Sequence, residues 1–424
     1  MKVAFVSQFF DAVLPPDQGS IGIWTYEVAR RLAADHETTV IARRPRGGQA
    51  RLRVEDIQFE LLPCAPLRVW TGASHVWTRL RPHVQPLFAQ GFYAIEFLTQ
   101  TTRALRRLAP DVIHLQNFPH YVPAIRRAVP DAAIVLHMHC DWLSQLDYDS
   151  MARGVAAADL VIGCSSHVVS AARRRFPQAR TQFAVVPNGT PLDRSAPTSI
   201  NAGDSRVLFV GRISPEKGIH TLLDAWPKVV EAHPAARLDI VGPSVETPRE
   251  FLIDLSKDQD VLDLSRFYPE SGSPRGSYSS ALRTMIPSQL AHTVTLSGPM
   301  PYERMPEKYA ASSIVVNPSL SESFGMSLVE ALATGTPVVA TRVGGMPEIV
   351  EATGGGLLVE KNDPAALADA IVQLLSHPAL REELGRRGAQ RVAELYPWAR
   401  IAVLTQDIHK EALSIRQQKG KRAS

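Results

Sequence analysis

The sequence predicts an α/β protein that consists of two doubly wound parallel-sheet domains. Short runs of β-branched and other apolar residues alternate with amphipathic helical patterns along the chain. These runs are apolar on both faces, as is typical of parallel strands that helices cover on two sides. Near the middle, residues 187–206 are rich in Pro, Gly, Ser, Asn and Asp and show no periodicity. We interpret this segment as the linker between the two domains.

The first domain is predicted over residues 1–190. Its clearest helical pattern covers residues 22–34, where apolar side chains recur with the period of a helix (GIWTYEVARRLAA). Strands are expected at 2–6, 38–42, 111–115, 133–139, 160–163 and 183–186, with helical stretches between them.

The second domain is predicted over residues 205–397. A helix that starts at Gly218 should be interrupted at Pro227, because proline cannot donate a helical hydrogen bond. Residues 244–292 are polar and too long for an ordinary connection, so they are interpreted as an insertion. A final helix at about 398–417 precedes a basic tail, KGKRAS, that is expected to be disordered. Strands are expected at 206–211, 237–242, 293–298, 313–318, 337–341 and 356–360.

Composition excludes several classes of protein. The 424 residues are 45% hydrophobic, which is enough for two or three packed domains. Cys64, Cys140 and Cys164 lie far apart, so neither a disulfide scaffold nor a Cys-x-x-Cys pair is present. No apolar run reaches the ~18 residues of a membrane span. The amino terminus is typical of a first strand rather than a signal peptide, so a cytoplasmic location is expected.

Positive charge is concentrated in the first half of the chain. Residues 1–200 carry 22 Lys and Arg against 16 Asp and Glu, a net of +6, whereas residues 201–424 carry 24 against 26, a net of −2. A basic first half indicates an anionic partner such as a phosphate or a membrane surface. No nucleic-acid-binding motif accompanies the charge, so nucleic acid is not expected. Ordinary solvated Arg-rich helix faces explain the charge equally well.

Ligands of open parallel sheets bind at the carboxyl ends of the strands, so the loops after the strands are the candidate sites. The first such loop is VGRISPEKGI at 210–219, where Gly211 ends a strand, Arg212 follows and Lys217 precedes a helix. Two cations beside a helix start suit a diphosphate, since each charge-assisted hydrogen bond contributes about 1.5–3 kcal/mol. A surface Arg and Lys beside a Pro-Glu turn is the alternative.

The second loop belongs to the segment SLSESFGMSLVEALATGTPVVA at 319–340. Glu322 lies in the loop, and Glu330 lies on a helix predicted to begin near Met326. Two carboxylates near a strand end accept hydrogen bonds from a polyhydroxyl ligand, and Gly325 lets the backbone approach it. The neighbours of Glu330 are apolar, so this carboxylate needs a partner within the protein. A solvated helix face is the alternative for Glu330.

Two further loops have weaker signals. Gly344-Gly345, between a strand and a helix, forms either an anion-binding backbone nest or only a turn. In the first domain, Gly19 and Ser20 lead from the first strand into a helix and are a candidate phosphate-facing helix start. The loop lacks the G-x-G-x-x-G spacing, which argues against a dinucleotide dehydrogenase.

His137 and His139 end a strand pattern and share one face of that strand. We interpret them as part of a polar site rather than a metal site, because no second pair of ligands accompanies them. The Asp-x-Asp spacings at 147–149 and 258–260 follow no strand, so no metal is expected there either.

Residues 67–100 mix aromatic side chains with Arg68, Arg79 and Arg81. Acceptor binding or docking to an anionic membrane would explain this composition. A helical hairpin that packs as core and rim is the favoured alternative.

Together, VGRISPEKGI, ESFGMSLVE with its E-x7-E spacing and EALATGTPVVATRVGGMPEIV resemble glycosyltransferase family 4, retaining enzymes of the GT-B fold. The resemblance covers most of the chain and is strongest over 207–242 and 293–400. It implies an interdomain cleft, a nucleotide-sugar-binding domain at 205–397 and an acceptor-side domain at 1–190. The final helix resembles the one that crosses back to the first domain in this fold.

The resemblance also implies roles for individual residues. Arg212 and Lys217 match the pair that holds the donor diphosphate, Glu322 matches the residue that contacts the donor sugar, and Glu330 matches the residue that holds the ribose hydroxyls. His139 matches a histidine near the transferred sugar, although Cys140 follows it where the family usually has Asp. The implied catalytic residues are Glu322, His139, Arg212 and Lys217; the implied donor-binding residues are Gly19, Ser20, Gly211, Arg212, Lys217, Ser323, Phe324, Gly325, Met326 and Glu330.

The function implied by this resemblance is retaining, metal-independent transfer of a sugar from a nucleotide-diphosphate sugar to a hydroxyl acceptor. Cell-surface glycan, glycolipid or secondary-metabolite biosynthesis is the expected setting, without a cofactor, and the basic first domain would contact the inner face of the membrane. The alternatives are a nucleotide-sugar epimerase of GT-B architecture and a catalytically silent sugar-nucleotide-binding protein.

Overall fold

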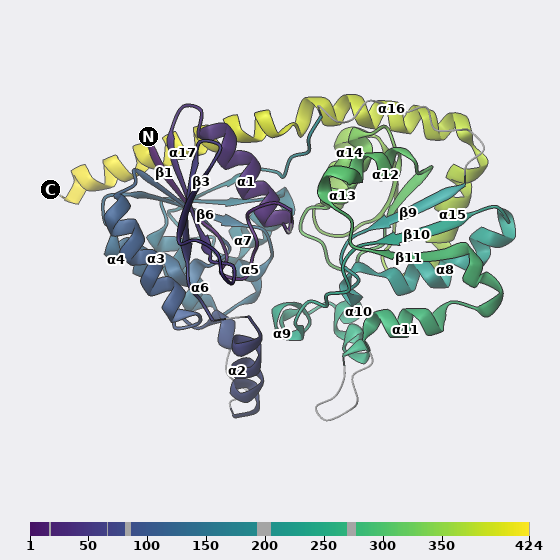
Figure 1. Ribbon diagram of the computed structural model, residues 1–424, viewed down its shortest axis with the longest axis horizontal. Helices are drawn as coiled ribbons and strands as arrows, with labels where there is room; N and C mark the ends of the chain where they lie inside the picture. The colour runs from purple at the N-terminus through teal and green to yellow at the C-terminus, as the bar shows by residue number, and fades with distance from the viewer. Residues whose placement is uncertain (17, 66, 81–85, 193–204, 269–276, 424) are drawn as a thin grey trace. The chain divides into compact units, whose positions relative to one another are not determined.

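The computed structural model describes residues 1–16, 18–65, 67–80, 86–192, 205–268 and 277–423. The chain divides into two compact units, which Figure 1 draws as ribbons. Unit 1 comprises Met1–Asn188 together with Trp398–Ser424, and unit 2 comprises Gly189–Pro397. None of the helices within the described residues is both long enough and apolar enough to span a membrane.

Unit 1 is built on an eight-stranded sheet of order β3-β4-β2-β1-β5-β6-β7-β8. All neighbouring strands are parallel except β3 and β4, which form an antiparallel hairpin at the edge. The central strands β5, β6 and β7 are buried along their whole length, which explains their continuous apolar runs. The strands are β1 Lys2–Val6, β2 Glu37–Arg43, β3 Arg51–Val54, β4 Ile57–Leu62, β5 Val112–Gln116, β6 Ala133–Met138, β7 Leu160–Gly163 and β8 Gln182–Val185.

Helices cover this sheet, and the last helix of the chain is one of them. That helix, α17, packs against α1 and the strands β5 and β6 (Figure 1). The helices of unit 1 are α1 Ser20–Leu32, α2 Leu67–Leu80, α3 Ile95–Leu108, α4 Val122–Ala128, α5 Trp142–Gln145, α6 Tyr148–Ala157, α7 Ser166–Arg175 and α17 Trp398–Ala423. Short 3-10 helices occur at Leu87–Ala89 and Pro119–Tyr121.

Unit 2 is built on a six-stranded parallel sheet of order β11-β10-β9-β12-β13-β14. The chain runs outward from β9 in one direction and then, from β12, in the other, so β9 and β12 flank the point where the strand order reverses. The strands are β9 Arg206–Val210, β10 Arg237–Val241, β11 Val294–Gly298, β12 Ile314–Asn317, β13 Val338–Thr341 and β14 Gly356–Val359.

The longer helices of unit 2 supply the apolar layer over the sheet. Helix α8 packs against α15, and both contribute to a core with β9, β10 and β12. The helices are α8 Ile219–Ala232, α9 Arg249–Leu252, α10 Gln259–Leu262, α11 Tyr278–Met285, α12 Met305–Ala310, α13 Met326–Ala333, α14 Met346–Thr353, α15 Pro364–Ser376 and α16 Pro378–Leu395. Short 3-10 helices occur at Pro215–Lys217, Ile253–Leu255, Asp263–Phe267, Ser288–Thr293 and Tyr302–Arg304.

The structure confirms every strand predicted from the sequence, with ends within one residue, but three expectations differ from it. The hairpin β3–β4 was not predicted. Helix α8 is not interrupted at Pro227. The free energy gained by burying its apolar face exceeds the cost of one missing hydrogen bond. That face consists of Leu222, Leu223, Trp226 and Val229. The expected disordered tail is wrong up to Ala423, since α17 continues through it.

The predicted insertion at 244–292 folds onto unit 2 where it is described; residues 269–276 lie outside the described residues. Tyr278 and Leu282 of α11 join the apolar core over the sheet. Ile253, Val261 and Leu264 form a small cluster with Leu320, which belongs to the loop after β12. The insertion therefore supports a candidate site loop.

Candidate functional site

Three of the predicted loops follow β9, β12 and β13, which are adjacent strands of the second sheet. Because parallel strands end at the same edge, these loops lie side by side. The loop after β9 contacts the loop after β12 through hydrogen bonds from the Leu320 and Ser321 N–H groups to the Glu216 carbonyl. Thr341, at the end of β13, donates its hydroxyl to the Ser319 carbonyl at 2.6 Å. Sequence segments far apart in the chain thus form one surface.

Two glycines allow these loops to pack so closely. A Cβ at Gly218 (φ +67°) would lie 2.0 Å from the Pro318 carbonyl oxygen, and one at Gly344 (φ +58°) would lie 1.5 Å from the Glu322 carbonyl oxygen. Any other residue would displace the opposing backbone. Gly344-Gly345 forms a turn, one of the two predictions for this pair, and Gly344 also packs against the backbone of Glu322.

Lys217 and Glu322 meet at the centre of this surface. The Lys217 Nζ donates to Glu322 Oε2 at 2.7 Å, and both side chains are more than four-fifths buried. Burial by itself would raise the pKa of Glu322, but the Lys217 ammonium lowers the pKa below its usual value. The site therefore holds a carboxylate and an ammonium ready to bind polar ligand groups.

Arg212 lies beside the same loop and is held by Glu216, a residue that the sequence analysis did not select. Its guanidinium contacts Glu216 Oε1 at 3.1 Å and remains 46% exposed. Glu216 is buried and also accepts hydrogen bonds from the Ser214 and Thr247 hydroxyls. The only sign of this role in the sequence is a carboxylate between two candidate cations, Arg212 and Lys217. Its partner Thr247 belongs to the insertion, so the contact between them could not be predicted.

Helix α13 begins at this edge with an uncapped amino terminus. Gly325 is its N-cap residue, has φ +103°, and provides no side chain to the free N–H groups of the first turn. Phe324 is buried against Tyr396, while Ser323 and Met326 are partly exposed on either side. The helix start thus presents backbone donors just after Glu322 in the sequence, and Glu322 in turn contacts Lys217.

Glu330 on α13 has a partner within the protein, as its apolar neighbours predict. The Tyr309 hydroxyl donates to Glu330 Oε2 at 2.6 Å. Burial raises the pKa of Glu330 to about 7, although hydrogen bonds from Tyr309 and Tyr302 act in the opposite direction. Gly211, at the end of β9, donates its N–H to the Val241 carbonyl, so its backbone serves the sheet.

In unit 1, the predicted residues lie around the start of α1 and the end of β6. Gly19 is the N-cap of α1 without a side-chain cap, and exposed Ser20 opens the helix. Gly22 lies in the first turn of α1, and a Cβ at this position would lie 2.1 Å from the Ala12 carbonyl oxygen. The loop after β1 is therefore packed directly onto the first turn of α1.

His139 follows β6 and is held by two residues that the sequence analysis did not select. Its ring Nε2 contacts Gln116 Oε1 at 2.7 Å, and its backbone N–H donates to Asn117 Oδ1 at 2.6 Å. Burial lowers the pKa of His139 to about 3, so the ring is neutral near pH 7. Its ring contacts that of His137 in a tilted arrangement, with centroids 3.9 Å apart. The two side chains thus share one side of the strand end, as their spacing of two predicts.

His137 itself belongs to the core. Its Nδ1 lies 3.1 Å from His114 Nε2, and His114 Nδ1 lies 2.9 Å from His409 Nε2 on α17. These buried rings fasten the final helix to β5 and β6. Within the part of the chain that the structure describes, no three His, Cys, Asp or Glu side chains gather into a group that would hold a metal ion.

Two family models match consecutive parts of the chain. The model described as Glycosyltransferase Family 4 matches residues 21–194, and the model described as Glycosyl transferases group 1 matches residues 193–391. The chain belongs to this family of glycosyltransferases.

Relatives of this glycosyltransferase agree with that assignment. The D-inositol 3-phosphate glycosyltransferase of Streptomyces avermitilis is 28% identical, over 94% of this chain and 84% of that protein. The structure of sucrose-phosphate synthase from Thermosynechococcus elongatus superposes with a TM-score of 0.76 at 22% identity, covering 98% and 100% of the two chains. Anabaena Alr3699/HepE, in complex with UDP and glucose, has a TM-score of 0.64 at 20% identity, covering 96% and 99%. The fold is GT-B, as the sequence predicts.

The second unit of this glycosyltransferase combines fixed cations, a carboxylate and a helix start on one surface. Cations and helix N–H groups are able to bind a diphosphate, and a carboxylate is able to accept hydrogen bonds from hydroxyl groups. The predicted residues of the second unit, from Arg212 to Glu330, lie on or beside the three packed loops. Gly19, Ser20 and His139 belong to the first unit.

Proposed function

We propose that this glycosyltransferase transfers a sugar from a nucleotide-diphosphate sugar to a hydroxyl acceptor with retention of configuration and without a metal ion. The observation that carries the proposal is the Lys217–Glu322 contact of 2.7 Å at the point where the strand order of the second sheet reverses. It joins a cation suited to phosphate and a carboxylate suited to sugar hydroxyls.

In the proposed complex, unit 2 binds the donor. Lys217 and Arg212 hold the diphosphate, and the backbone at Gly325 faces it. Glu322 orients the donor sugar, and Glu330 accepts hydrogen bonds from the ribose hydroxyls. Anabaena Alr3699/HepE, solved with UDP-glucose, supports a nucleotide-sugar donor.

Unit 1 is proposed to bind the acceptor, with His139 near the transferred sugar. Gly19 and Ser20 are proposed to contribute to donor binding. The C1–O bond to the diphosphate breaks with oxocarbenium character, and the acceptor oxygen attacks from the same face. The departing diphosphate oxygen takes the acceptor proton, while Lys217 and Arg212 stabilise its charge. The acceptor would come from cell-surface glycan, glycolipid or secondary-metabolite synthesis, with the basic unit 1 near an anionic membrane surface.

A panel of nucleotide sugars, scored first by thermal shift and then by hydrolysis and transfer, tests the proposal. We expect one donor class to stabilise the protein and to release nucleoside diphosphate. Release of an epimerised nucleotide sugar would instead indicate an epimerase. Binding without turnover to any acceptor would indicate a silent binding protein.

Lys217→Ala is expected to lower kcat by about 10²–10³-fold, because it removes a donor from the developing diphosphate charge. Glu322→Ala should have a comparable effect. Lys228→Ala on α8, which removes only an exposed ion pair with Asp369, is the matched control. Unchanged kinetics of Lys217→Ala, with a folded protein by circular dichroism, would contradict the diphosphate role.

Metal independence is tested with a chelator. We expect full transfer activity in excess EDTA, since protein cations take the role of a metal. Loss of activity that a divalent ion restores would contradict this part of the proposal.

A further inference from the structure

Helix α2 carries an apolar face that unit 1 does not bury. Val69, Ala73, Val76 and Leu80 recur with the spacing of one helix face and are all exposed; Val76 is 59% and Leu80 75% exposed. We call these four residues the α2 face. In most helices such a stripe packs on a core, but α2 projects from the helix layers of unit 1 (Figure 1).

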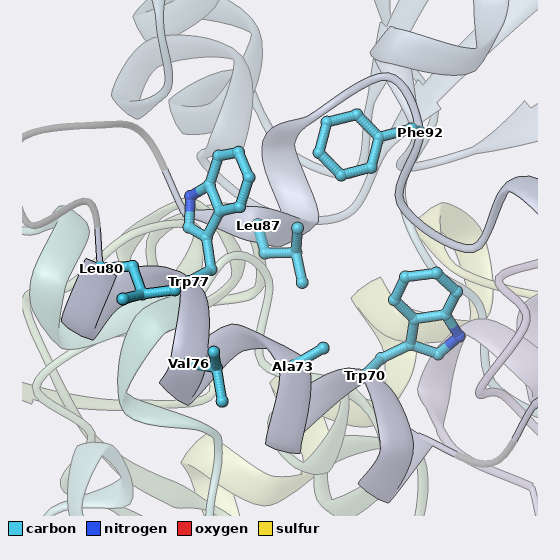
Figure 2. A pocket seen from close by; sticks show the side chains of 7 residues that line it. All are labelled: Trp70, Ala73, Val76, Trp77, Leu80, Leu87 and Phe92. Atoms are coloured by element: carbon cyan, nitrogen blue, oxygen red, sulfur yellow. The ribbon is translucent and has the colours of Figure 1, made fainter.

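An apolar groove of about 520 Å³ lies along the α2 face. Figure 2 shows its walls: side chains of α2 on one side, and Leu87 and Phe92 from the following segment on the other. The Trp77 and Phe92 rings meet edge to face with centroids 5.6 Å apart. The groove is lined by Trp70, Ala73, Val76, Trp77, Leu80, Leu87 and Phe92. This lining is almost entirely apolar, which suits hydrocarbon chains.

The charge of the surrounding segment indicates what covers this surface. Residues 61–95 contain no Asp or Glu but contain Arg68, Arg79 and Arg81. The side chains of Arg68 and Arg79, and Arg81 as a whole, lie outside the described residues, whereas the positive charge of the segment follows from the sequence. Apolar and tryptophan side chains on a helix within a basic, acid-free segment are typical of helices that lie in a membrane interface.

A second copy of the chain is a poorer occupant. Two such segments facing each other would bring their arginines together, and the adjacent Glu96 already accepts a hydrogen bond from Trp70 at 3.3 Å. A bilayer with anionic headgroups instead satisfies both features: its headgroups attract the basic segment, and its acyl chains contact the apolar α2 face.

We propose that the α2 face and its groove insert into the surface of a membrane that contains anionic lipid, the groove receiving lipid acyl chains. This inference rests on the proposed function in one respect: docking would place unit 1 where a membrane-borne acceptor hydroxyl is available.

Vesicle flotation of the full chain tests the inference. We expect binding to vesicles of phosphatidylcholine mixed with phosphatidylglycerol, and weak binding to phosphatidylcholine alone. The double variant Val76→Ser/Leu80→Gln should lower the partition coefficient by at least about tenfold, because two apolar contacts with lipid are lost. Val403→Ser on α17 removes an equally exposed apolar side chain outside the groove and should leave binding unchanged.

Brominated acyl chains provide an independent readout. They should quench part of the tryptophan fluorescence of the bound protein, and Trp77→Phe should keep binding but lose much of that quenching. Hydrolysis of the nucleotide sugar, which needs no membrane, is measured on the same preparations, so failure of docking is distinguished from failure of the proposed function.

Three results would overturn the inference. The first is no binding of the wild-type protein to the mixed vesicles. The second is unchanged binding of Val76→Ser/Leu80→Gln. The third is a dimer, by light scattering, that this double variant separates while neither protein binds vesicles, because a second copy would then cover the α2 face.

Discussion

At the scale of single residues, the hydrogen bonds around His139 determine which ring nitrogen carries the proton. The Thr25 hydroxyl donates to the Ile21 carbonyl at 2.8 Å, so it accepts from Gln116 Nε2 at 3.3 Å. Gln116 Oε1 then accepts from His139 Nε2–H at 2.7 Å. The Nδ1 atom of His139 is left without the proton. Gln116 is therefore a positioning residue for His139.

Exchange of Gln116 tests this arrangement. In Gln116→Glu the new carboxylate should raise the pKa of His139 from about 3, because it favours the imidazolium. Gln116→Leu removes the acceptor of His139 Nε2–H, so the proton should no longer be confined to Nε2. This substitution should lower kcat more than it changes the donor KM. Nitrogen NMR shifts of the labelled ring report both effects.

Gln100→Glu is the control, since the Gln100 amide donates to two backbone carbonyls, those of Pro63 and Glu96, rather than contacting His139. An Nδ1–H tautomer in the wild-type protein, or an unmoved His139 pKa in Gln116→Glu, would contradict the assignment.

At the scale of elements, the close approach of the loops after β9 and β12 depends on Gly218. Gly218 and Gly298 have similar backbone angles, φ +67° and +69°, but a Cβ would meet the Pro318 carbonyl oxygen at 2.0 Å only at Gly218. At Gly298 a Cβ would meet nothing within 4 Å. Substitution at Gly298 therefore tests backbone strain alone, whereas substitution at Gly218 tests backbone strain together with loop packing.

Gly298→Ala should lower the free energy of unfolding by about 1–2 kcal/mol, the cost of a left-handed backbone for a residue with a Cβ. Gly218→Ala should cost more and should also raise the donor KM by about tenfold or more, because Lys217 moves with the displaced loop. Urea unfolding and donor kinetics of both variants measure this. Equal effects of the two substitutions would show that the contact with Pro318 has no role.

At the scale of the whole molecule, buried neutral histidines make the stability depend on pH. Burial lowers the pKa of His120 and His409 to about 3, against about 6.5 in an unfolded chain. Below about pH 6.5 the unfolded chain binds these protons and the folded chain does not. The free energy of unfolding therefore falls as the pH drops from about 6.5 toward 3.

We expect a loss of about 2 kcal/mol per buried histidine at about pH 5, relative to neutral pH. Urea unfolding over this pH range measures the slope. His409→Asn should reduce the slope even if it lowers overall stability, whereas His292→Asn, at an exposed position, should not change it. A slope that His409→Asn leaves intact would assign the acid sensitivity to other groups.

The sequence determined the fold class and the location of the loops, since both depend on local patterns. Apolar runs with the period of a strand predict β9 and β12 within one residue of their observed ends. Arg212, Lys217 and Glu322 were selected because charged residues just after such strands lie at a common edge. The interdomain cleft, the metal independence and the cytoplasmic location stay predictions.

Only the tertiary structure decided how these residues are partnered. Thr247 reaches Glu216 from the insertion, and Tyr309 reaches Glu330 from α12. Gln116, on a neighbouring strand, holds His139. The exposure of the α2 face likewise follows from the rest of the chain, because the same helical stripe would be core if another element covered it. Local sequence determines period and charge, whereas partners and burial depend on segments far apart in the chain.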